Sequence, residues 1–177
     1  QIAEWLAGEG TAVDDEGTLL NLHSSTAAVI VAVVDGHSSA LPDVDAIRSY
    51  VGRGIPNLVK RALAGSIEVD DTLPPPADAL ASFRHHYARE NGRNVRCFPG
   101  VIEGLEDLKA KGIPMAVITN KAHAFTIPLL EMTGLAGYFD VVVSGDTLPK
   151  IKPDPMALVW ACGRLDVSPA DAVFVGD

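Results

Sequence analysis

The spacing of apolar residues divides the chain near residue 97. From Val101 onward, short apolar runs alternate with helical stripes in which apolar residues recur every three or four positions. Residues 22–96 have a mostly helical pattern instead. Strands that alternate with helices over short connections predict a parallel sheet with right-handed crossovers. The sequence therefore predicts an α/β fold: a doubly wound parallel sheet carrying an inserted α-helical part.

The second part of the chain is expected to alternate three helices with three strands. The strands are expected at 115–118, 141–143 and 172–175. The helices are expected from Val101 to a stop at Gly112, over 125–132 with an end at Gly134, and over 156–165. In the last helix we expect an inward-facing stripe formed by Leu158, Val159, Cys162 and Leu165.

The first part is interpreted as a helical insertion over residues 22–96. Helices are expected over 43–50, 56–64 and 77–90, the last with Leu80, Phe83 and Tyr87 on one face. The continuous apolar run 26–34 is ambiguous, because periodicity cannot separate a buried helix from a strand there. An alternative makes Val29–Val34 the central strand and Asp35-Gly36 its functional turn. That alternative provides no paired carboxylates, because Val33 stands two residues before Asp35.

Composition and charge exclude several classes of protein. The net charge of −9 argues against a nucleic-acid partner, which normally requires a basic surface. Cys97 and Cys162 are too few for a disulfide scaffold, so a cytoplasmic location is expected. The longest apolar run, Ala27 to Val34, is eight residues long, whereas a membrane-spanning helix needs about 20. The start at Gln1 and the end at Asp177, directly after an apolar run, suggest a piece of a longer chain.

A pair of acids near the start is the first candidate for chemistry. Asp14 and Glu16 stand two residues apart and are followed by Gly17-Thr18. In such a turn one carboxylate can attack a substrate while the other handles protons. The alternative is an acidic surface turn, since Asp and Gly favour turns for backbone reasons alone. The strand expected before Asp14 is thin, because only Thr11-Ala12-Val13 precedes it.

Further polar residues follow the expected strands of the second part. Thr119 and Asn120 follow one strand, Lys152 lies in a proline-rich segment after the next, and Asp177 follows the last. Ligands of open α/β sheets bind at the carboxyl ends of the strands, so these residues are candidates for one site. Taken singly, each has an ordinary alternative: a helix cap, a solvated lysine and a simple turn.

In chain order these residues resemble the haloacid dehalogenase-like hydrolase superfamily, from Asp14 to Asp177. Five segments are similar to its phosphoglycolate phosphatase branch: residues 41–65 (which contain PDVDAIRSYVGRGIPNLVKRALAG), FPGVIEGLEDLKAKG, VITNK, YFDVVVSGDTLPKIKPDP and VFVGD. The resemblance implies a Rossmann-like phosphatase core over 11–21 and 97–177, and a helical cap over 22–96. The family's first motif usually reads Asp-x-Asp-Gly-Thr, so Glu16 is one methylene longer than the usual acid.

The resemblance also implies a role for each candidate residue. Asp14 would be the nucleophile that forms an aspartyl-phosphate, and Glu16 the general acid/base. Thr119 would hydrogen-bond the transferring phosphoryl group, and Lys152 would offset its charge. A Mg²⁺ ion would be held by Asp14, the Glu16 backbone carbonyl and Asp177. Candidate substrate-binding residues are Thr18, Asn120 and Arg53, an arginine between two glycines that suits a carboxylate.

The function predicted from these residues is that of a Mg²⁺-dependent phosphatase acting on a small phosphorylated acid. The expected reaction is hydrolysis of 2-phosphoglycolate to glycolate and phosphate. Two alternatives stay open at this point. One is a β-phosphoglucomutase-like phosphoryl transferase or a sugar-phosphate phosphatase. The other is a non-catalytic phosphate-binding relative, which the presence of Glu16 and the thin first strand favour.

Overall fold

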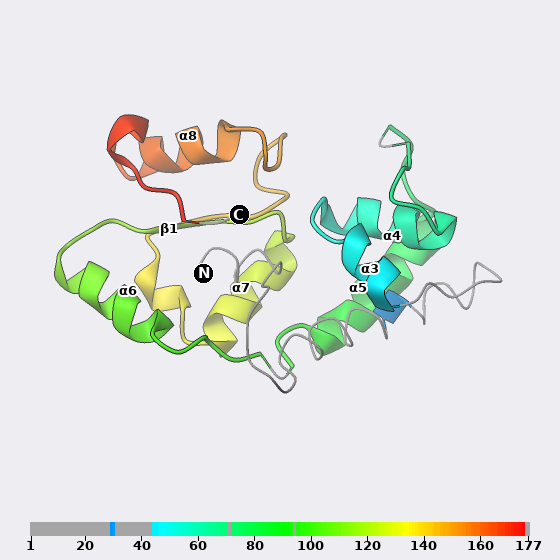
Figure 1. Ribbon diagram of the computed structural model, residues 1–177, viewed down its shortest axis with the longest axis horizontal. Helices are drawn as coiled ribbons and strands as arrows, with labels where there is room; N and C mark the ends of the chain where they lie inside the picture. Colours follow the sequence, from blue (N-terminus) through cyan, green and yellow to red (C-terminus); the bar gives the residue numbers. More distant parts are fainter. Residues whose placement is uncertain (1–28, 31–43, 71, 94, 176–177) are drawn as a thin grey trace. The chain divides into compact units, whose positions relative to one another are not determined.

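A computed structural model describes residues 29–30, 44–70, 72–93 and 95–175. These residues fall into two compact units, one over 95–175 and the other within 29–93. Figure 1 colours both by position in the sequence. Asp14, Glu16, Thr18 and Asp177 lie outside the described residues.

The unit over 95–175 alternates helices and strands, as the hydrophobic pattern predicts. Its elements, in chain order, are α6 (Val101–Ala110), β1 (Ala116–Ile118), α7 (His123–Met132), η1 (Ala136–Tyr138), β2 (Val141–Val143), α8 (Met156–Arg164) and η2 (Pro169–Asp171). Gly112 and Gly134 follow α6 and α7 with φ of 68° and 73°. This left-handed conformation, which glycine adopts without a steric penalty, ends the two helices where the sequence predicted.

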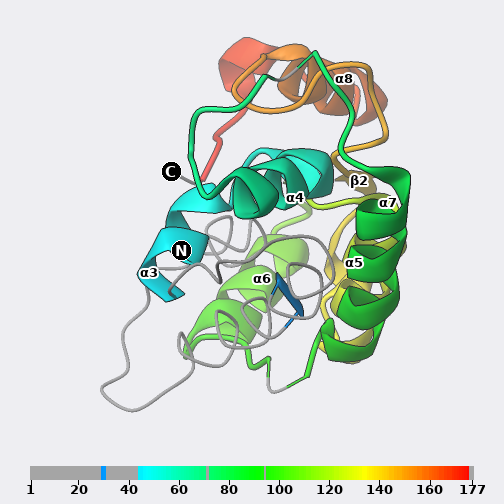
Figure 2. The same ribbon diagram turned by 90° about the vertical axis from the view of Figure 1, so that its right-hand side faces the viewer.

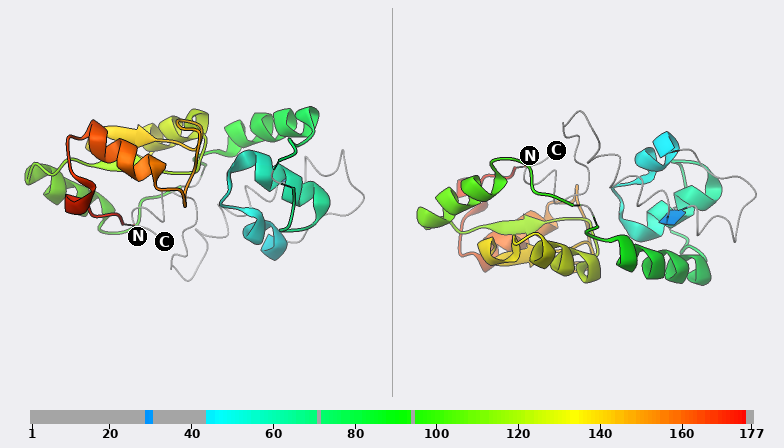
Figure 3. Two further views of the ribbon diagram at one scale, coloured as in Figure 1. Left: turned by 90° about the horizontal axis from the view of Figure 1, so that it is seen from above. Right: turned by 90° about the horizontal axis from the view of Figure 1, so that it is seen from below.

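The sheet has helices on both of its faces. β1 and β2 pair in parallel, with Val117 opposite Val142. These two valines pack with α6 and α7, whereas Ile118 and Val143, one position further along each strand, pack with α8. Figure 1 and the two views of Figure 3 show α8 on one face of the sheet and α6 and α7 on the other. This arrangement, which follows from the two-residue period of a strand, confirms the predicted α/β fold.

Two details of the predicted unit were wrong. Residues 172–175 are neither strand nor helix in the structure, and the side chain of Val173 is 88% exposed. Among the described residues the sheet consists of β1 and β2, and an apolar run forms a strand only where a neighbouring strand accepts its hydrogen bonds. In α8, Val159 is exposed, and the smaller Ala157 and Ala161 are buried instead.

The unit within 29–93 is helical. It contains α3 (Val44–Tyr50), α4 (Gly54–Ala64) and α5 (Ala77–Glu90), which are seen well in Figure 2. Phe83 of α5 packs into one core with Ile47 of α3 and Val59 of α4, and all three are buried. Leu80 and Tyr87 flank that core, as the predicted stripe required.

The described part of the ambiguous run 26–34 belongs to this helical core. Val29 and Ile30 are helical, and both are buried with Phe83. The alternative that placed a strand from Val29 was therefore wrong at these two residues, while its turn at Asp35-Gly36 lies outside the described residues. None of the helices in the described ranges has the length and apolar character needed to cross a membrane.

Leu105 provides a test of the core between the sheet and the helices α6 and α7. Its side chain is 1% exposed and packs with Val101, Val117 and Leu130. We expect Leu105→Ala to lower the free energy of unfolding by about 2–5 kcal/mol, because it leaves a cavity. Urea unfolding followed by circular dichroism measures this change.

Met132, at the end of α7, is the matched control because it is 59% exposed. Met132→Ala should change the free energy of unfolding by no more than about 0.5 kcal/mol. Equal losses in the two variants would contradict the assignment of Leu105 to the core.

Candidate active site

Four of the predicted site residues lie in the described parts of the chain. Thr119, Asn120 and Lys152 belong to the unit over 95–175, and Arg53 belongs to the helical unit. The structure brings the first three together at the carboxyl end of β1. The predicted metal ligands Asp14, Glu16 and Asp177 are outside the described residues, so their grouping stays a prediction.

Thr119 continues the sheet by one residue beyond β1. Its backbone N–H donates to the carbonyl of Val143 at 2.9 Å, and its side chain is buried. Its hydroxyl oxygen accepts a hydrogen bond from the Lys121 N–H at 3.1 Å. The hydroxyl is thus fixed at the carboxyl edge of the sheet, where α/β proteins bind their ligands.

Asn120 holds the main chain of Lys152 with both ends of its side-chain amide. The carboxamide oxygen accepts from the Lys152 N–H at 2.9 Å, and the carboxamide N–H donates to the Lys152 carbonyl at 3.1 Å. The two residues are 32 positions apart in the sequence. This pair of bonds joins the segment after β1 to the loop between β2 and α8.

The segment after β2 packs closely against the same turn. The Gly145 N–H donates to the Lys121 carbonyl at 2.8 Å. A Cβ at Gly145 would overlap the carbonyl oxygen of Asn120 and lie 2.7 Å from its carbonyl carbon. No side chain can fit there without a shift of backbone, because real Cβ atoms do not approach backbone so closely. Gly145 therefore allows the two strand ends to meet.

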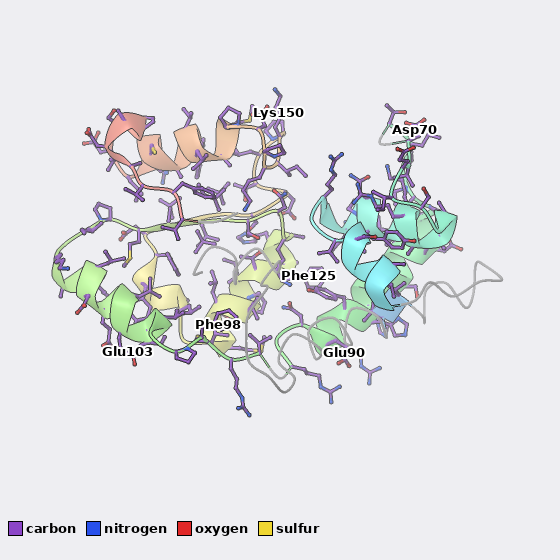
Figure 4. All side chains as sticks on the ribbon, in the orientation of Figure 1. Asp70, Glu90, Phe98, Glu103, Phe125 and Lys150 are labelled. Carbon is purple, nitrogen blue, oxygen red and sulfur yellow. The ribbon has the colours of Figure 1, made fainter. Side chains whose placement is uncertain are left out.

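The loop that carries Lys152 is also fixed near its end. Lys150 forms an ion pair with Asp154 at 2.9 Å, and Asp154 accepts from the Met156 N–H at 3.0 Å, at the start of α8. These two hydrogen bonds, the one from Lys150 first, lower the pKa of Asp154 from its ordinary value. Figure 4 labels Lys150 in this loop. Of the two lysines in this loop, Lys150 is thus paired with a carboxylate.

The ammonium of Lys152 lies over an aromatic ring. Its Nζ is 5.6 Å from the ring centroid of Phe174, close enough for a cation–π contact. Phe174 belongs to the segment that leads to Asp177. Three peptide units, about 11 Å when extended, separate the two residues in sequence.

The start of α7 is held by a residue that sequence reasoning missed. The carboxylate of Asp146 accepts from the His123 N–H at 2.7 Å, and an acid at this end of a helix is favoured by the helix dipole. The Thr126 hydroxyl donates to the Lys121 carbonyl at 3.2 Å. The sequence signal for this contact is the position of Gly145-Asp146, which follows β2 after one intervening residue, Ser144.

Arg53 immediately precedes α4 in the helical unit. It is exposed, and its carbonyl accepts from the Asn57 side chain at 3.3 Å. Its neighbours Gly52 and Gly54 have φ of 116° and 79°, a conformation that favours glycine over residues with a Cβ. The glycines thus shape the loop that presents Arg53. Its contact with substrate stays a prediction.

No group of three or more His, Cys, Asp or Glu side chains that could hold a metal ion occurs among the described residues. His85 and His86, adjacent in α5, lie edge to face with ring centroids 5.3 Å apart.

Gly145 provides a test of the contact between the two strand ends. We expect Gly145→Ala to lower the free energy of unfolding by about 1–3 kcal/mol, because the added methyl group overlaps the Asn120 backbone. Chemical denaturation of the full-length protein measures the change.

Gly163 is the matched control, because a Cβ there would have no heavy atom within 4 Å. Gly163→Ala lies in α8 and should raise the free energy of unfolding by up to about 1 kcal/mol through helix propensity. Unchanged stability in Gly145→Ala would show that the strand ends do not pack as described.

Comparison with known proteins identifies the family. The family model of the haloacid dehalogenase-like hydrolases matches residues 14–177. A phosphoglycolate phosphatase of Thiobacillus denitrificans is 42% identical over 165 residues, which cover 93% of this chain and 73% of that protein.

Solved structures agree with this match. A predicted phosphoglycolate phosphatase of Haemophilus somnus 129pt superposes with a TM-score of 0.65 at 27% identity, over 82% of this chain and 66% of that one. A Thermotoga maritima protein that carries the provisional name β-phosphoglucomutase gives a TM-score of 0.61 at 25% identity, over 84% and 66%. The chain thus spans about two thirds of these structures. It belongs to the haloacid dehalogenase-like hydrolases.

Proposed function

We propose that this chain is the larger part of a Mg²⁺-dependent phosphatase that hydrolyses 2-phosphoglycolate to glycolate and phosphate. The predicted enzyme class, a phosphoric monoester hydrolase, is confirmed by the family and by the relative from Thiobacillus denitrificans. The observation that carries the proposal is the meeting of Thr119, Asn120 and Lys152 at the carboxyl edge of the sheet. A hydroxyl at such an edge, beside a loop that carries a lysine, suits a phosphoryl group.

Thr119 and Lys152 would bind the phosphoryl group in this proposal. Phosphoryl transfer depends on positioning and on positive charge near the equatorial oxygens. The Lys152 ammonium supplies such a charge, and the Thr119 hydroxyl can donate its proton to a phosphoryl oxygen. Both side chains come from backbone fixed by hydrogen bonds, so little reorganisation is needed when charge develops.

Asp14 and Glu16 would carry the covalent steps. The Asp14 carboxylate attacks phosphorus, the bond from phosphorus to the glycolate oxygen breaks, and Glu16 gives its proton to that leaving oxygen. Glu16 then takes a proton from water, which attacks the aspartyl-phosphate, releases phosphate and restores Asp14. Thr18 follows these acids in the same motif and is proposed to contact the phosphoryl group.

The proposed Mg²⁺ site has the donor chemistry that this ion prefers. Asp14 and Asp177 offer carboxylate oxygens and Glu16 a backbone carbonyl, and Mg²⁺ takes hard oxygen ligands. When bound, the ion would neutralise charge on the phosphoryl oxygens. The contact between the Lys152 ammonium and the Phe174 ring, three residues before Asp177 in the sequence, supports the proposal that Asp177 and Lys152 serve one site.

The helical unit is proposed as a cap that excludes water from the reaction. Its Arg53 would bind the carboxylate of 2-phosphoglycolate, since a guanidinium forms paired hydrogen bonds with a carboxylate. A second candidate function, phosphoryl transfer between positions of a sugar phosphate, is favoured by the likeness to the Thermotoga maritima structure. The two functions differ in product.

Asp14→Asn tests the nucleophile. In the full-length protein this change should lower the release of phosphate from 2-phosphoglycolate by at least about a thousandfold, because the covalent route is lost. A colorimetric phosphate assay under saturating substrate measures the rate. Equal rates for the two proteins would contradict the role of Asp14.

The same assay with a panel of phosphorylated substrates separates the alternatives. Fastest turnover of 2-phosphoglycolate supports the proposed substrate. Isomerised sugar phosphate without free phosphate would identify a mutase. Binding of beryllium fluoride without turnover of any substrate would identify a non-catalytic relative.

Removal of the metal gives an independent prediction. Treatment of the full-length protein with EDTA should abolish phosphate release, and added Mg²⁺ should restore it, because the phosphoryl charge is otherwise only partly offset. The same treatment should remove the rise in melting temperature that Mg²⁺ with beryllium fluoride produces. Activity that survives complete chelation would contradict the metal site.

A further inference from the structure

We infer that Asn120 is a positioning residue for Lys152, and that it sets the point from which the lysine ammonium reaches the phosphoryl group. This inference rests on the proposed role of Lys152. It gives Asn120 a function other than the contact with substrate that the sequence predicts.

The two hydrogen bonds fix orientation as well as position. Both join one carboxamide to one residue, through the Lys152 N–H at 2.9 Å and the Lys152 carbonyl at 3.1 Å. A single bond would allow the loop to rotate about it, whereas two bonds from one carboxamide to the N–H and the carbonyl of one residue restrain that rotation. The direction in which the Lys152 side chain leaves the backbone is therefore set by the amide plane of Asn120.

Asn120 is itself held by the sheet. The residue before it, Thr119, donates to the Val143 carbonyl, and the residue after it, Lys121, accepts from the Gly145 N–H. Gly145 also packs directly on the Asn120 carbonyl. The residues on either side of Asn120 are thus hydrogen-bonded to the last residue of β2 and to the segment that follows it. These bonds hold the backbone of Asn120, so that its side chain is a rigid anchor.

Lys152 needs such an anchor because its loop has neither helix nor strand from 144 to 155. Contacts at the loop's two ends join Ser144 to Thr147 and Asp154 to Met156. The Asn120 amide ties the part of the loop that carries Lys152 to the segment after β1. The two lysines of the loop differ in their contacts: Asn120 binds the backbone of Lys152, whereas the ammonium of Lys150 pairs with Asp154. An ammonium on a flexible four-carbon stem is placed well only if its backbone is fixed.

A double-mutant cycle in the full-length protein tests the inference. We would measure kcat and KM for 2-phosphoglycolate in Asn120→Ala, in Lys152→Ala and in the variant that combines both. If Asn120 acts through Lys152, Asn120→Ala should lower kcat by about ten- to a hundredfold, since a displacement near 1 Å has that effect. In the Lys152→Ala background the same change should alter kcat by less than twofold.

Asn120→Asp is the second variant, for use if the alanine variant does not fold. It keeps the size of the side chain but replaces the N–H donor with an oxygen that faces the Lys152 carbonyl. Its kcat should fall as in Asn120→Ala, and its effect should likewise vanish when Lys152 is alanine. The control is Thr133→Val, which removes two hydrogen bonds to backbone at the end of α7 and should leave kcat within twofold of wild type.

The outcomes separate this inference from the proposed function. If Lys152→Ala keeps the wild-type kcat, the proposed role of the lysine fails, and the positioning role fails with it. If Lys152→Ala is slow but the Asn120 variants lower kcat by the same factor in both backgrounds, the phosphatase assignment stands and the positioning role is overturned. Wild-type kcat in a folded Asn120 variant also overturns it.

Discussion

The parallel pairing of β1 with β2 is the interaction on which the described site depends. Each strand has three residues, and the register places Ile118 opposite Val143. The next residue along each strand, Thr119 and Ser144, therefore reaches the same edge, and both are buried. A slip of one residue would exchange the residues facing α8 with those facing α6 and α7. Alternate residues of each strand are buried against helices on opposite faces, and this burial fixes the register. The register in turn sets the position at which the apolar strands are followed by polar residues.

The sequence predicted the elements well where two kinds of signal agreed. α5 runs from Ala77 to Glu90 as expected, because three prolines precede it and an apolar stripe continues through it. α6 and α7 end before glycines with left-handed backbone. In α8 the expected stripe was drawn through the larger apolar residues. Of that stripe Cys162 is buried as predicted, whereas Val159 is exposed. Ala157 and Ala161 are buried with Val143, because small side chains allow the helix to approach the sheet.

The failure at 172–175 has a different cause. The run Ala-Val-Phe-Val has the composition of a buried strand, but composition does not supply the neighbouring strand that a sheet requires. Val173 and Val175 are exposed in the structure. Phe174 is exposed as well, and its ring lies near the Lys152 ammonium.

For the candidate site, sequence order predicted Thr119, Asn120 and Lys152 as members but did not define the contacts between them. The pairing of the Asn120 amide with the Lys152 backbone joins positions 32 apart, and no periodic pattern carries such a contact. Gly145 was also missed, since a glycine after a strand usually indicates a turn and not a close approach of backbone. The three-dimensional structure shows the close approach, because a Cβ at position 145 would overlap the Asn120 carbonyl.

The way these residues are held has a consequence for the chemistry. Thr119 and Lys152 are fixed through backbone hydrogen bonds to one short sheet, so the part of the site that would bind the phosphoryl group is formed in advance. A preformed site spends little free energy on reorganisation when charge develops. Glu16, one methylene longer than the acid usual in the family, would then act on a phosphoryl group whose position is set by other residues. In the proposed mechanism the longer side chain of Glu16 would therefore have to reach the leaving oxygen through its own conformation, because Thr119 and Lys152 would hold the phosphoryl group.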